Sequence, residues 1–507
     1  MSVKYSVNVG DAGRDYPHYW ELCVGSCHAA TLLQATVQEH IRKAHEAIGF
    51  QYIRFHGLFD DDMSVVMENN MFSMGGGNNR QISFFNIDRI FDFLLSIGMK
   101  PFVEVGFMPT PLASGKTELF HYRANCTMPA KDEDWMDLIE KFITHLEDRY
   151  GKEEVQQWFF EVWNEPNLRF FFDGTQEDYF HLYEMTARSI KKIDPALKVG
   201  GPATSNNMWI PEFRNFCETN HVPYDFITTH HYPSDDPLST AGMNGPGYKG
   251  PGLDEESRKK MMEDPEAAKK VLAAFLNRKN ENPRDVLYRC AKKAKEEAGA
   301  YPLYYTEWNG GHFDTNYAAA AVTQTLAYNE GLVEGYSYWC VSDIFEEMGL
   351  HGLPFNNEFG LVNVYGTPKP SFRLFEELHK AGAKRLDVAG EGHRTAEVLA
   401  LADENRVTLF CYNHDIEERD IKAEEMEIAV AGGVKRIQKG VIDATHANPI
   451  VVWEAQGKPS YPTKEQIQEI EEASHIAFEE IPVAEGDQVL RFTAEPESIT
   501  IFRIDKA

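Results

Sequence analysis

The chain has 507 residues, of which 43% are hydrophobic and 12% aromatic, so it is long enough for two or three domains with large cores. Its 79 acidic and 50 basic residues give a formal net charge of −29. Such an acidic chain is not expected to bind nucleic acid or an anionic membrane through bulk charge, and a neutral or weakly charged substrate suits it better.

The N-terminal segment and the cysteines indicate a cytoplasmic protein. Residues 1–15 show no basic stretch followed by an apolar one, so no signal peptide is expected. No segment approaches the roughly 18 apolar residues of a membrane span. The seven cysteines are odd in number and scattered, which is typical of reduced thiols. Cys23, Cys27 and His28 lack a second ligand pair at zinc spacing, so neither a metal nor another cofactor is expected.

Short apolar runs alternate with amphipathic helical segments from about residue 20 to residue 339. Eight runs predict strands, at residues 21–24, 52–56, 101–105, 158–163, 198–201, 226–229, 303–307 and 335–339. They are mostly apolar throughout, as parallel strands buried on both faces are. The clearest helices are predicted at residues 31–48, 86–97, 134–149, 176–193 and 316–329, with Thr31 and Asp134 as capping residues.

This alternation predicts an α/β fold, a (β/α)8 TIM barrel. A doubly wound sheet is less favoured, because no Gly-x-Gly-x-x-Gly opens an early helix. The catalytic barrel is expected over residues 16–350, with a long excursion after strand six at residues 234–300. The excursion is Gly- and Pro-rich to residue 253, and helices are predicted at 254–280 and 283–297. It either forms one wall of a binding site or packs outside the barrel.

The sequence changes character after Pro370. A last helix at residues 371–381 is followed by short strands at 395–401, 406–413, 425–430, 434–442, 488–493 and 498–504, with an acidic helix at 464–474. This pattern predicts a C-terminal β-sandwich accessory domain. The alternating residues 3–9 are expected to pair with it, so the second domain comprises residues 1–15 and 370–507. It either binds carbohydrate or, as we favour, braces the barrel.

The strongest chemical signal is Trp163-Asn164-Glu165-Pro166, where an apolar strand ends in a carboxylic acid and is stopped by proline. At average residue usage, such a tetrapeptide arises by chance in roughly one chain in a thousand of this length. The seventh strand brings Glu307 to the same rim of the barrel. Two glutamates facing each other there are what glycoside hydrolysis requires: one protonates the leaving oxygen, and the other attacks the anomeric carbon or activates water.

Other strand ends supply candidate sugar contacts. Asn164 is placed to bind the 2-hydroxyl, and His230 and Tyr232 are expected to donate hydrogen bonds to Glu307. Simpler explanations exist for single residues. Glu307 alone could be a rim salt bridge, His56 and His230 could be core histidines, and Trp339 could be core packing instead of a sugar platform. Arg54 is expected to be buried and paired with a glutamate.

The chain resembles glycoside hydrolase family 39, and within it the β-xylosidases. The segments that carry the resemblance are Cys23-Val24-Gly25, Ile48-Gly49-Phe50-Gln51-Tyr52-Ile53-Arg54, Gly106-Phe107-Met108-Pro109, Phe160-Glu161-Val162-Trp163-Asn164-Glu165-Pro166-Asn167-Leu168, Val199-Gly200-Gly201-Pro202-Ala203, Thr306-Glu307, Ser337-Tyr338-Trp339, Ser342-Asp343-Ile344-Phe345-Glu346-Glu347 and Phe359-Gly360-Leu361. They extend over nearly the whole chain, including the β-rich tail with Trp453 and Pro459.

The resemblance implies a retaining mechanism with Glu165 as acid/base and Glu307 as nucleophile, their carboxyl groups about 5–5.5 Å apart. It implies sugar contacts by His56, Asn164, His230, Tyr232, Trp339, Glu347, Phe120 and Phe171. It further implies an exo-acting β-xylosidase that removes xylose from the non-reducing end of xylo-oligosaccharides in a pocket, with a homotetramer as the expected assembly.

Several alternatives remain open. One alternative is an α-L-arabinosidase, because arabinopyranose differs from xylose only in the configuration of one ring carbon. An endo-acting xylanase would need an open cleft, and a non-catalytic carbohydrate-binding barrel would need a missing carboxyl. A uronate substrate is disfavoured, because no basic residue is placed at the rim. The turn Ser26-Cys27-His28-Ala29 and residues 237–253 depart from the family pattern, and they leave the sugar and the leaving group undecided.

Overall fold

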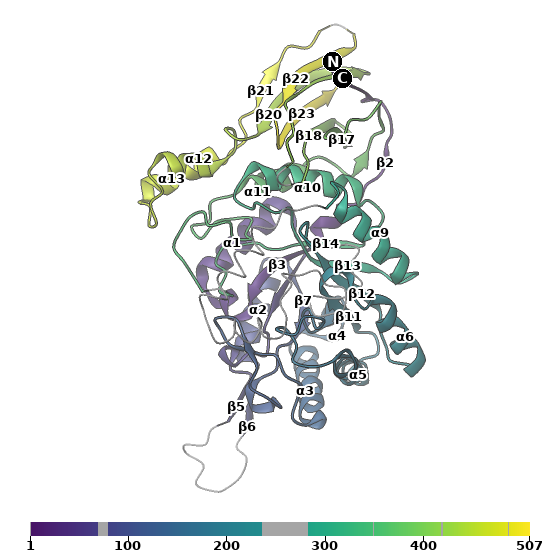
Figure 1. Ribbon diagram of the computed structural model, residues 1–507, viewed down its shortest axis with the longest axis vertical. Helices are drawn as coiled ribbons and strands as arrows, with labels where there is room; N and C mark the ends of the chain where they lie inside the picture. The colour runs from purple at the N-terminus through teal and green to yellow at the C-terminus, as the bar shows by residue number, and fades with distance from the viewer. Residues whose placement is uncertain (1, 69–79, 236–281, 348, 417–418, 485) are drawn as a thin grey trace.

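The protein consists of a closed parallel barrel and a β-rich unit that contains both chain termini (Figure 1). The computed structural model describes residues 2–68, 80–235, 282–347, 349–416, 419–484 and 486–507. Most of the predicted strand-six excursion, including the helix at 254–280, lies outside these ranges. None of the helices in them is long and apolar enough to cross a membrane.

Eight parallel strands close the barrel in the order β10-β11-β12-β13-β14-β3-β4-β7. Their bounds are β3 (Cys23–His28), β4 (Tyr52–His56), β7 (Lys100–Val105), β10 (Phe159–Val162), β11 (Lys198–Thr204), β12 (Phe226–His231), β13 (Leu303–Trp308) and β14 (Gly335–Tyr338). Each predicted strand is confirmed, with ends shifted by a few residues. The predicted TIM barrel is therefore confirmed, and the doubly wound alternative is wrong.

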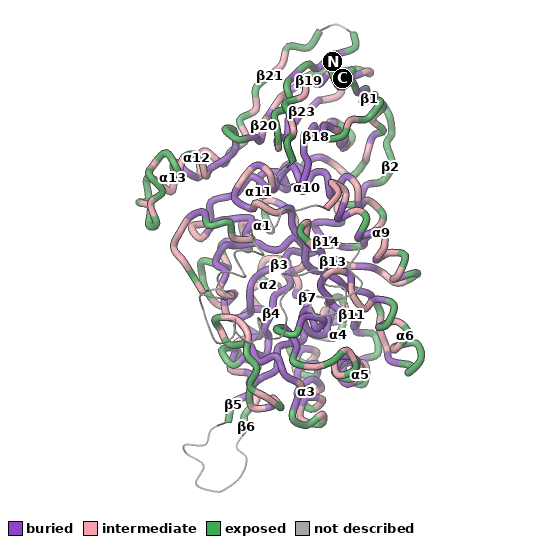
Figure 2. The backbone as a smooth tube through the Cα atoms, in the orientation of Figure 1, coloured by how far each residue is buried: buried purple, intermediate pink, exposed green. Residues whose placement is uncertain are grey.

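Helices surround the barrel, and their outward faces are exposed (Figure 2). They are α1 (Ala35–Ile48), α2 (Phe85–Ser96), α3 (Asp132–Tyr150), α4 (Lys152–Val155), α5 (Gln176–Ile193), α6 (Ile210–Asn220), α9 (Val286–Ala298), α10 (Asn316–Tyr328) and α11 (Pro370–His379). The short helices η1 (Tyr19–Glu21), η2 (Ala29–Leu33), η3 (Asp61–Met63), η4 (Thr110–Leu112) and η5 (Ser205–Asn207) occupy connecting segments.

The predicted caps at Thr31 and Asp134 are wrong. Thr31 lies inside η2, where its hydroxyl donates to the carbonyl of His28, and α1 begins after Gln34. Asp134 lies in the first turn of α3, after Lys131, where a negative charge still favours the helix dipole. A capping box forms instead at α5: Thr175 and Asp178 each accept a backbone N–H of the other.

The barrel interior is layered by polarity. Aromatic side chains close its N-terminal end: Phe102, Phe159 and Phe226 pack with Cys23, beside Tyr52 and Tyr304. Charged side chains occupy the layer above, where Arg54, Glu104 and Glu161 are fully buried. Because buried charges must be paired, this layer forms an ion-pair network that supports the residues at the C-terminal rim.

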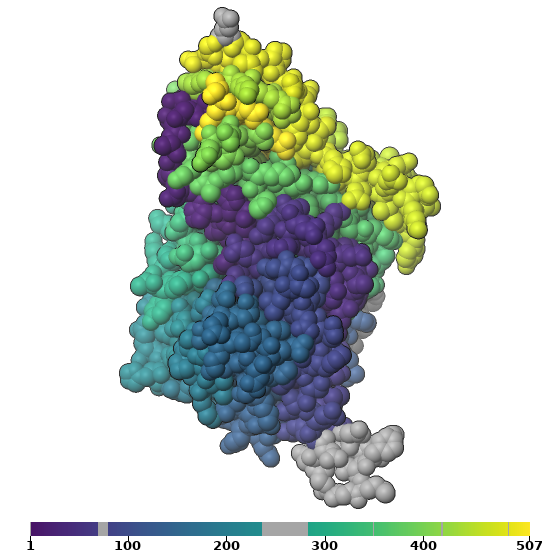
Figure 3. Space-filling model, turned by 180° about the vertical axis from the view of Figure 1, so that it is seen from behind, coloured from purple at the N-terminus to yellow at the C-terminus, as the bar shows by residue number. Residues whose placement is uncertain are grey.

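The β-rich unit consists of two sheets. One has the order β16-β1-β19-β22, and the other β2-β15-β17-β18-β23-β20-β21. The strands are β1 (Val3–Asn8), β2 (Arg14–Asp15), β15 (Lys384–Arg385), β16 (Val388–Gly390), β17 (Ala396–Ala402), β18 (Arg406–Asn413), β19 (Glu424–Ala431), β20 (Val434–Ile442), β21 (Glu479–Ile481), β22 (Gln488–Ala494) and β23 (Ser498–Lys506). As expected, the N-terminal strand joins this unit, because β1 pairs with β16 and β19. Figure 3 shows this purple segment against the green and yellow C-terminal chain.

The seven-stranded sheet is buried on both faces. On β18, Leu409 and Cys411 face the other sheet, whereas Phe410 and Tyr412 belong to the barrel's core cluster. This alternation follows from the two-residue period of a strand. The unit therefore packs on the barrel beside α10 and α11 (Figure 1). Two further helices, α12 (Pro449–Ala455) and α13 (Lys464–Ala473), project to one side.

Two small hairpins extend barrel loops, and the sequence pattern did not predict them. They are formed by β5 (Val66–Glu68) with β6 (Arg80–Ile82), and by β8 (Glu118–Leu119) with β9 (Ala124–Asn125). Strands of two or three residues are too short to show a periodicity.

Candidate active site

Two glutamates lie at the C-terminal rim of the barrel, as predicted. Glu165 follows β10, the fourth barrel strand, and Glu307 lies in β13, the seventh. The backbone turns sharply before Glu165: Trp163 has a φ of 71° and Glu165 a φ of 43°. Non-glycine residues seldom adopt these values, and they cluster at functional sites. The Glu165 N–H donates to the carbonyl of Ala203 at 2.8 Å and ties this turn to β11.

The side chains of Glu165 and Glu307 approach each other closely. One oxygen of each carboxyl group and one nitrogen of His230 all lie within 4.8 Å of one another. Inverting glycosidases separate their carboxyl groups by about 6.5–9.5 Å to leave room for a water, whereas retaining enzymes hold them at about 5–5.5 Å. The short approach suits direct attack by one carboxylate. Three such ligand atoms could also hold a cation, but the positively charged guanidinium of Arg54 already lies against the Glu307 carboxylate.

Glu307 receives strong hydrogen bonds on both oxygens. Arg54 donates from Nη1 to Oε1 at 2.7 Å, and the Tyr232 hydroxyl donates to Oε2 at 2.5 Å. The predicted bond from Tyr232 is thus present. Charge-assisted bonds of this kind fix a carboxylate in one orientation, so these contacts suit a nucleophile that must stay ionised.

Arg54 is the centre of the buried network. It is fully buried, and it donates from Nε to Glu161 at 2.5 Å and from Nη2 to Asn164 at 3.0 Å. It also lies 2.9 Å from Glu104. The predicted pairing of a buried Arg54 with a glutamate is therefore confirmed, and it involves three glutamates. Burial raises the pKa of Glu104 to about 7, although the Arg54 charge opposes the rise.

The predicted hydrogen bond from His230 to Glu307 is wrong. Nδ1 of His230 lies 3.0 Å from Oε1 of Glu165 and 3.6 Å from the nearest oxygen of Glu307. Its Nε2 lies 3.0 Å from Oγ1 of Thr306, whose hydroxyl donates to Glu161 at 2.8 Å. The pairing of β12 with β13 is irregular between Thr229 and His230, and beyond this point the His230 ring lies nearer to Glu165 than to Glu307, although Glu307 is its register partner.

These contacts determine where the protons lie. Thr306 gives its hydrogen to Glu161, so it must accept from Nε2–H of His230. Burial, followed by the Arg54 charge, lowers the pKa of His230 well below its usual range and keeps the ring neutral. A neutral ring with a proton on Nε2 has a lone pair on Nδ1, and that lone pair can accept only from a protonated Glu165.

The surroundings of Glu165 favour the same protonation state. Burial, and then the charge of Glu307, raise the pKa of Glu165 well above its usual range. Two carboxylic acids that differ in this way are suited to separate tasks, one as a proton donor and the other as an ionised group.

His56 and Asn164 are held by their partners in one orientation. The Asn164 carbonyl oxygen accepts from Arg54, which leaves its amide N–H groups for the cavity. Nδ1 of His56 bonds Glu104 at 2.7 Å. Burial lowers the pKa of His56 to about 3, so the ring is neutral and Nε2 presents a lone pair.

A cavity of about 440 Å³ opens above these residues, within the usual size range of small-ligand sites. Eight of the ten predicted site residues line it: His56, Asn164, Glu165, Phe171, Tyr232, Glu307, Trp339 and Glu347. Phe120 lies behind, with its ring 5.4 Å from that of Phe171. His230 supports the floor without lining it.

Trp339 is placed by a glycine. A Cβ on Gly25 would lie 2.3 Å from Cε3 of the indole, so only glycine lets the ring lie flat against β3. The indole is almost fully buried in the chain, and one of its neighbours is the ring of His56, at 4.7 Å. Gly25 therefore shapes the site, although it is not among the residues that line the cavity.

Further lining residues come from loops that carry no strand signal. They are Pro233, Ser234, Asn309, Gly310, Gly311, His312, Phe313, Tyr317, Asn357 and Phe359. A buried lysine connects two of these loops: Nζ of Lys369 lies 2.6 Å from Asp314 and 2.7 Å from Asp343. Neither the loop residues nor this ion triad was predicted, because the partners lie far apart in the sequence.

A (β/α)8 barrel that brings two glutamates close together at the ends of its fourth and seventh strands has the arrangement of a glycoside hydrolase. The sequence comparisons agree. The chain matches the sequence profile of the family described as glycosyl hydrolases family 39 over residues 3–488, and it belongs to that family, whose members are retaining enzymes.

Similar proteins are known from several bacteria. The chain is 41% identical to a beta-xylosidase of Caldicellulosiruptor saccharolyticus over 94% of this chain and 93% of that protein. It is 31% identical to a beta-xylosidase of Geobacillus stearothermophilus, and the similar region covers 99% of this chain and 95% of that protein. Among solved structures, a monomeric beta-xylosidase from Caulobacter crescentus CB15 superposes with a TM-score of 0.81 at 28% identity and full coverage of both chains.

Proposed function

We propose that the protein is an exo-acting, retaining β-xylosidase that removes xylose from the non-reducing end of xylo-oligosaccharides. The observation that carries the chemistry is the close pair of Glu165 and Glu307 with opposite hydrogen-bond environments. The names of the two relatives, similar over nearly their whole length, support xylose as the sugar.

The reaction proceeds in two displacements. Glu307 attacks the anomeric carbon while Glu165 gives its proton to the departing glycosidic oxygen, and a covalent glycosyl-enzyme forms. Loss of that proton leaves Glu165 as a carboxylate, which then removes a proton from the incoming water. Arg54 and Tyr232 hold Glu307 in line for the attack.

The remaining lining residues bind the sugar. The free amide of Asn164 donates to the 2-hydroxyl, and the Nε2 lone pair of His56 accepts from a neighbouring hydroxyl. Glu347 lies with an oxygen 3.7 Å from Nε2 of His56 and accepts from further hydroxyls. Trp339 and Phe171 provide apolar surfaces for the ring faces. Phe120 supports Phe171 from behind.

A uronic acid would need a basic partner. Among the described residues that line the cavity there is no lysine or arginine, so a neutral glycone is favoured. The second candidate is an α-L-arabinosidase, because xylose and arabinopyranose differ at a single ring carbon. Turnover of aryl glycosides of β-D-xylose, α-L-arabinopyranose, α-L-arabinofuranose and β-D-glucose distinguishes these specificities. With xylohexaose as substrate, release of monosaccharide from the earliest times separates exo from endo action.

The nucleophile is tested by Glu307→Gly, assayed on an aryl β-xyloside with and without azide. We expect loss of turnover and its partial return with azide as an adduct, because azide fills the space of the missing carboxylate. Glu347→Gln is the matched control: it also alters a carboxylate in the cavity, but azide should not restore it. Unchanged turnover of Glu307→Gly would overturn the assignment, and turnover restored equally in both variants would show that azide does not report the nucleophile.

Three further aspects belong to this proposal. The catalytic unit comprises residues 16–350, and residues 1–15 with 370–507 act as a brace; the packing of the seven-stranded sheet on the barrel supports this.

The buried cysteines Cys23 and Cys27, both free thiols, suit a cytoplasmic location, which cell fractionation tests. A homotetramer is tested by light scattering; the similar Caulobacter enzyme is described as monomeric.

A further inference from the structure

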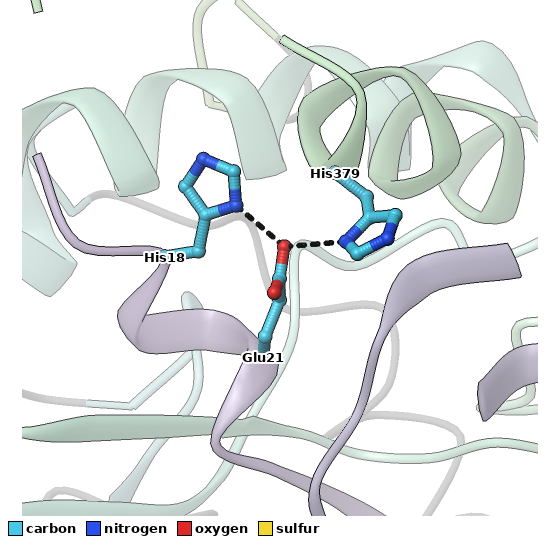
Figure 4. A group of neighbouring side chains, drawn as sticks. All are labelled: His18, Glu21 and His379. Carbon is cyan, nitrogen blue, oxygen red and sulfur yellow. Dashed lines mark hydrogen bonds and ion pairs between the residues drawn. The ribbon is translucent and has the colours of Figure 1, made fainter. Parts of the chain in front are cut away.

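Two histidines and a glutamate meet at the N-terminal face of the barrel, opposite the active site. His18 precedes η1, Glu21 ends η1 just before β3, and His379 is the last residue of α11. Figure 4 shows the two imidazole rings pointing at the same carboxylate from two elements. Glu21 and His379 are 358 positions apart in the sequence, so no local sequence pattern predicts this cluster.

The three side chains converge on one point. Nδ1 of His18 lies 2.6 Å from Oε1 of Glu21, and Nδ1 of His379 lies 2.9 Å from the same oxygen (Figure 4). The three ligand atoms all lie within 4.8 Å of one another. Two imidazole nitrogens and a carboxylate oxygen form a common donor set for zinc sites with three protein ligands and one open position.

The surroundings orient the His18 ring for this role. Its Nε2 lies 2.9 Å from the carbonyl oxygen of Gly382 and must donate to it, because a carbonyl can only accept. A metal-bound histidine usually donates its other ring N–H to such a partner, which fixes the tautomer. The ring also stacks on Trp20, with centroids 4.6 Å apart.

A glycine makes room for the second histidine. Gly49 ends α1 with a φ of 82°, and a Cβ there would lie 2.8 Å from Nδ1 of His379 and 3.2 Å from Oε2 of Glu21. Any side chain would push His379 away from the carboxylate. The space beside the two ligands therefore depends on this residue.

We propose that His18, Glu21 and His379 bind Zn²⁺ through Nδ1, a carboxylate oxygen and Nδ1, with water as the fourth ligand. Bonds of about 2.0–2.1 Å in a tetrahedron place neighbouring ligand atoms about 3.3 Å apart. The two nitrogen–oxygen distances must then lengthen by less than about 1 Å, which small side-chain rotations allow. The metal takes the place of the ring protons that face Glu21.

The exposed fractions of the side chains suit an open fourth position. His18 and Glu21 are 13% and 11% exposed, whereas His379 is 39% exposed. A hydrated ion can thus approach from the His379 side and keep one water. The site joins the segment before the first barrel strand to α11, the last helix around the barrel, so bound zinc should stabilise the closed barrel. It lies away from the rim and has no part in the proposed hydrolysis.

The test is a zinc titration of the full-length, EDTA-treated protein by calorimetry. His379→Ala is the main variant, because its exposed side chain can be removed with little effect on packing. His181→Ala is the matched control: His181 is also exposed and pairs with one carboxylate, Asp132, at 2.8 Å, but within the described part of the chain this pair has no third ligand. Wild type and both variants all contain Glu165, His230 and Glu307. Any zinc bound by these three residues is therefore the same in each titration and does not contribute to the difference between the proteins.

We expect wild type and His181→Ala to bind one equivalent that His379→Ala lacks or binds at least about tenfold more weakly. Zinc should raise the Tm of the first two only. Co²⁺ should give visible absorption bands that disappear in His379→Ala. Glu21→Gln, which keeps the shape of the side chain, should weaken zinc binding as well. Identical zinc stoichiometry and affinity in wild type and His379→Ala, or no binding by wild type, would overturn the proposal.

Discussion

Thr306→Val tests the proton arrangement that makes Glu165 an acid. The Thr306 hydroxyl accepts from Nε2 of His230 and donates to Glu161, at 3.0 Å and 2.8 Å. Valine has nearly the same shape but cannot accept a hydrogen bond. His230 then loses the contact that keeps its proton on Nε2, and the proton moves to Nδ1, which faces Glu165 at 3.0 Å.

The effect on Glu165 follows from the reversed hydrogen bond. In the wild type His230 accepts from the acid form, whereas in the variant it donates to the carboxylate. A hydrogen bond to a charged group contributes about 1.5–3 kcal/mol, and one pKa unit corresponds to about 1.4 kcal/mol. The pKa of Glu165, raised by burial and by Glu307, should therefore fall by about 1–2 units in Thr306→Val.

The sign follows from the role of Glu165. Only its protonated form donates to the leaving oxygen, so activity is lost as pH rises through its pKa. A lower pKa moves this alkaline limb to lower pH. The assay is the pH profile of kcat/KM on an aryl β-xyloside with a poor leaving group, because this parameter reports the free enzyme. Thr323→Val is the control, since its buried hydroxyl only donates to Ala319 within α10.

If the alkaline limb of the kcat/KM profile lies at the same pH in Thr306→Val and in wild type, the proposed tautomer of His230 is refuted, even if kcat falls. A loss of folding would be seen in the Tm, and the pH profile is then measured below that temperature. A shift of the same size in Thr323→Val would show that loss of any buried hydroxyl produces it.

Three other changes give separate expectations. Glu165→Ala should lower kcat on poor leaving groups by about 10²–10⁴ and abolish the alkaline limb; a retained limb in its pH profile would contradict the acid assignment. Gly25→Ala should displace Trp339, whose Cε3 would lie 2.3 Å from the new Cβ, and reduce kcat/KM about tenfold through loss of stacking. Gly10→Ala serves as its control: this exposed glycine lies away from the cavity, and a Cβ there would meet only the side-chain oxygen of Asn8, at 3.3 Å. Equal kinetics of the two variants would refute the effect. Lys369→Met should lower the free energy of unfolding by about 3–5 kcal/mol, because two buried aspartates lose their cation; urea denaturation measures this, and a loss below about 1 kcal/mol would contradict it.

Much of the fold could be predicted from local pattern. The eight barrel strands are four to seven residues long and each contains a short apolar run, and the helix at Gln176–Ile193 has the bounds predicted for it. These signals are strong because each buried strand or amphipathic face repeats over several residues. Helix starts were predicted less well. Thr31 was expected to cap a helix, but it forms part of η2, because capping depends on local backbone geometry that residue type alone does not fix.

The rim glutamates were predictable for a similar reason, since strand order alone carries Glu165 and Glu307 to one end of the barrel. The partner of His230 was not. Its register partner on β13 is Glu307, yet its ring bonds Glu165, because the direction of a side chain depends on the packing around it and not on strand order.

The sequence by itself determined the barrel, its accessory sheets and the placement of the two glutamates at the rim, because periodicity and strand ends are local properties of the chain. Only the tertiary structure decided the proton chain from Glu161 to Glu165, the Lys369 triad and the cluster of His18, Glu21 and His379. Each of these depends on side chains that are distant in sequence and meet within about 3 Å, the distance at which hydrogen bonds and ion pairs become specific. Chain folding alone creates such contacts.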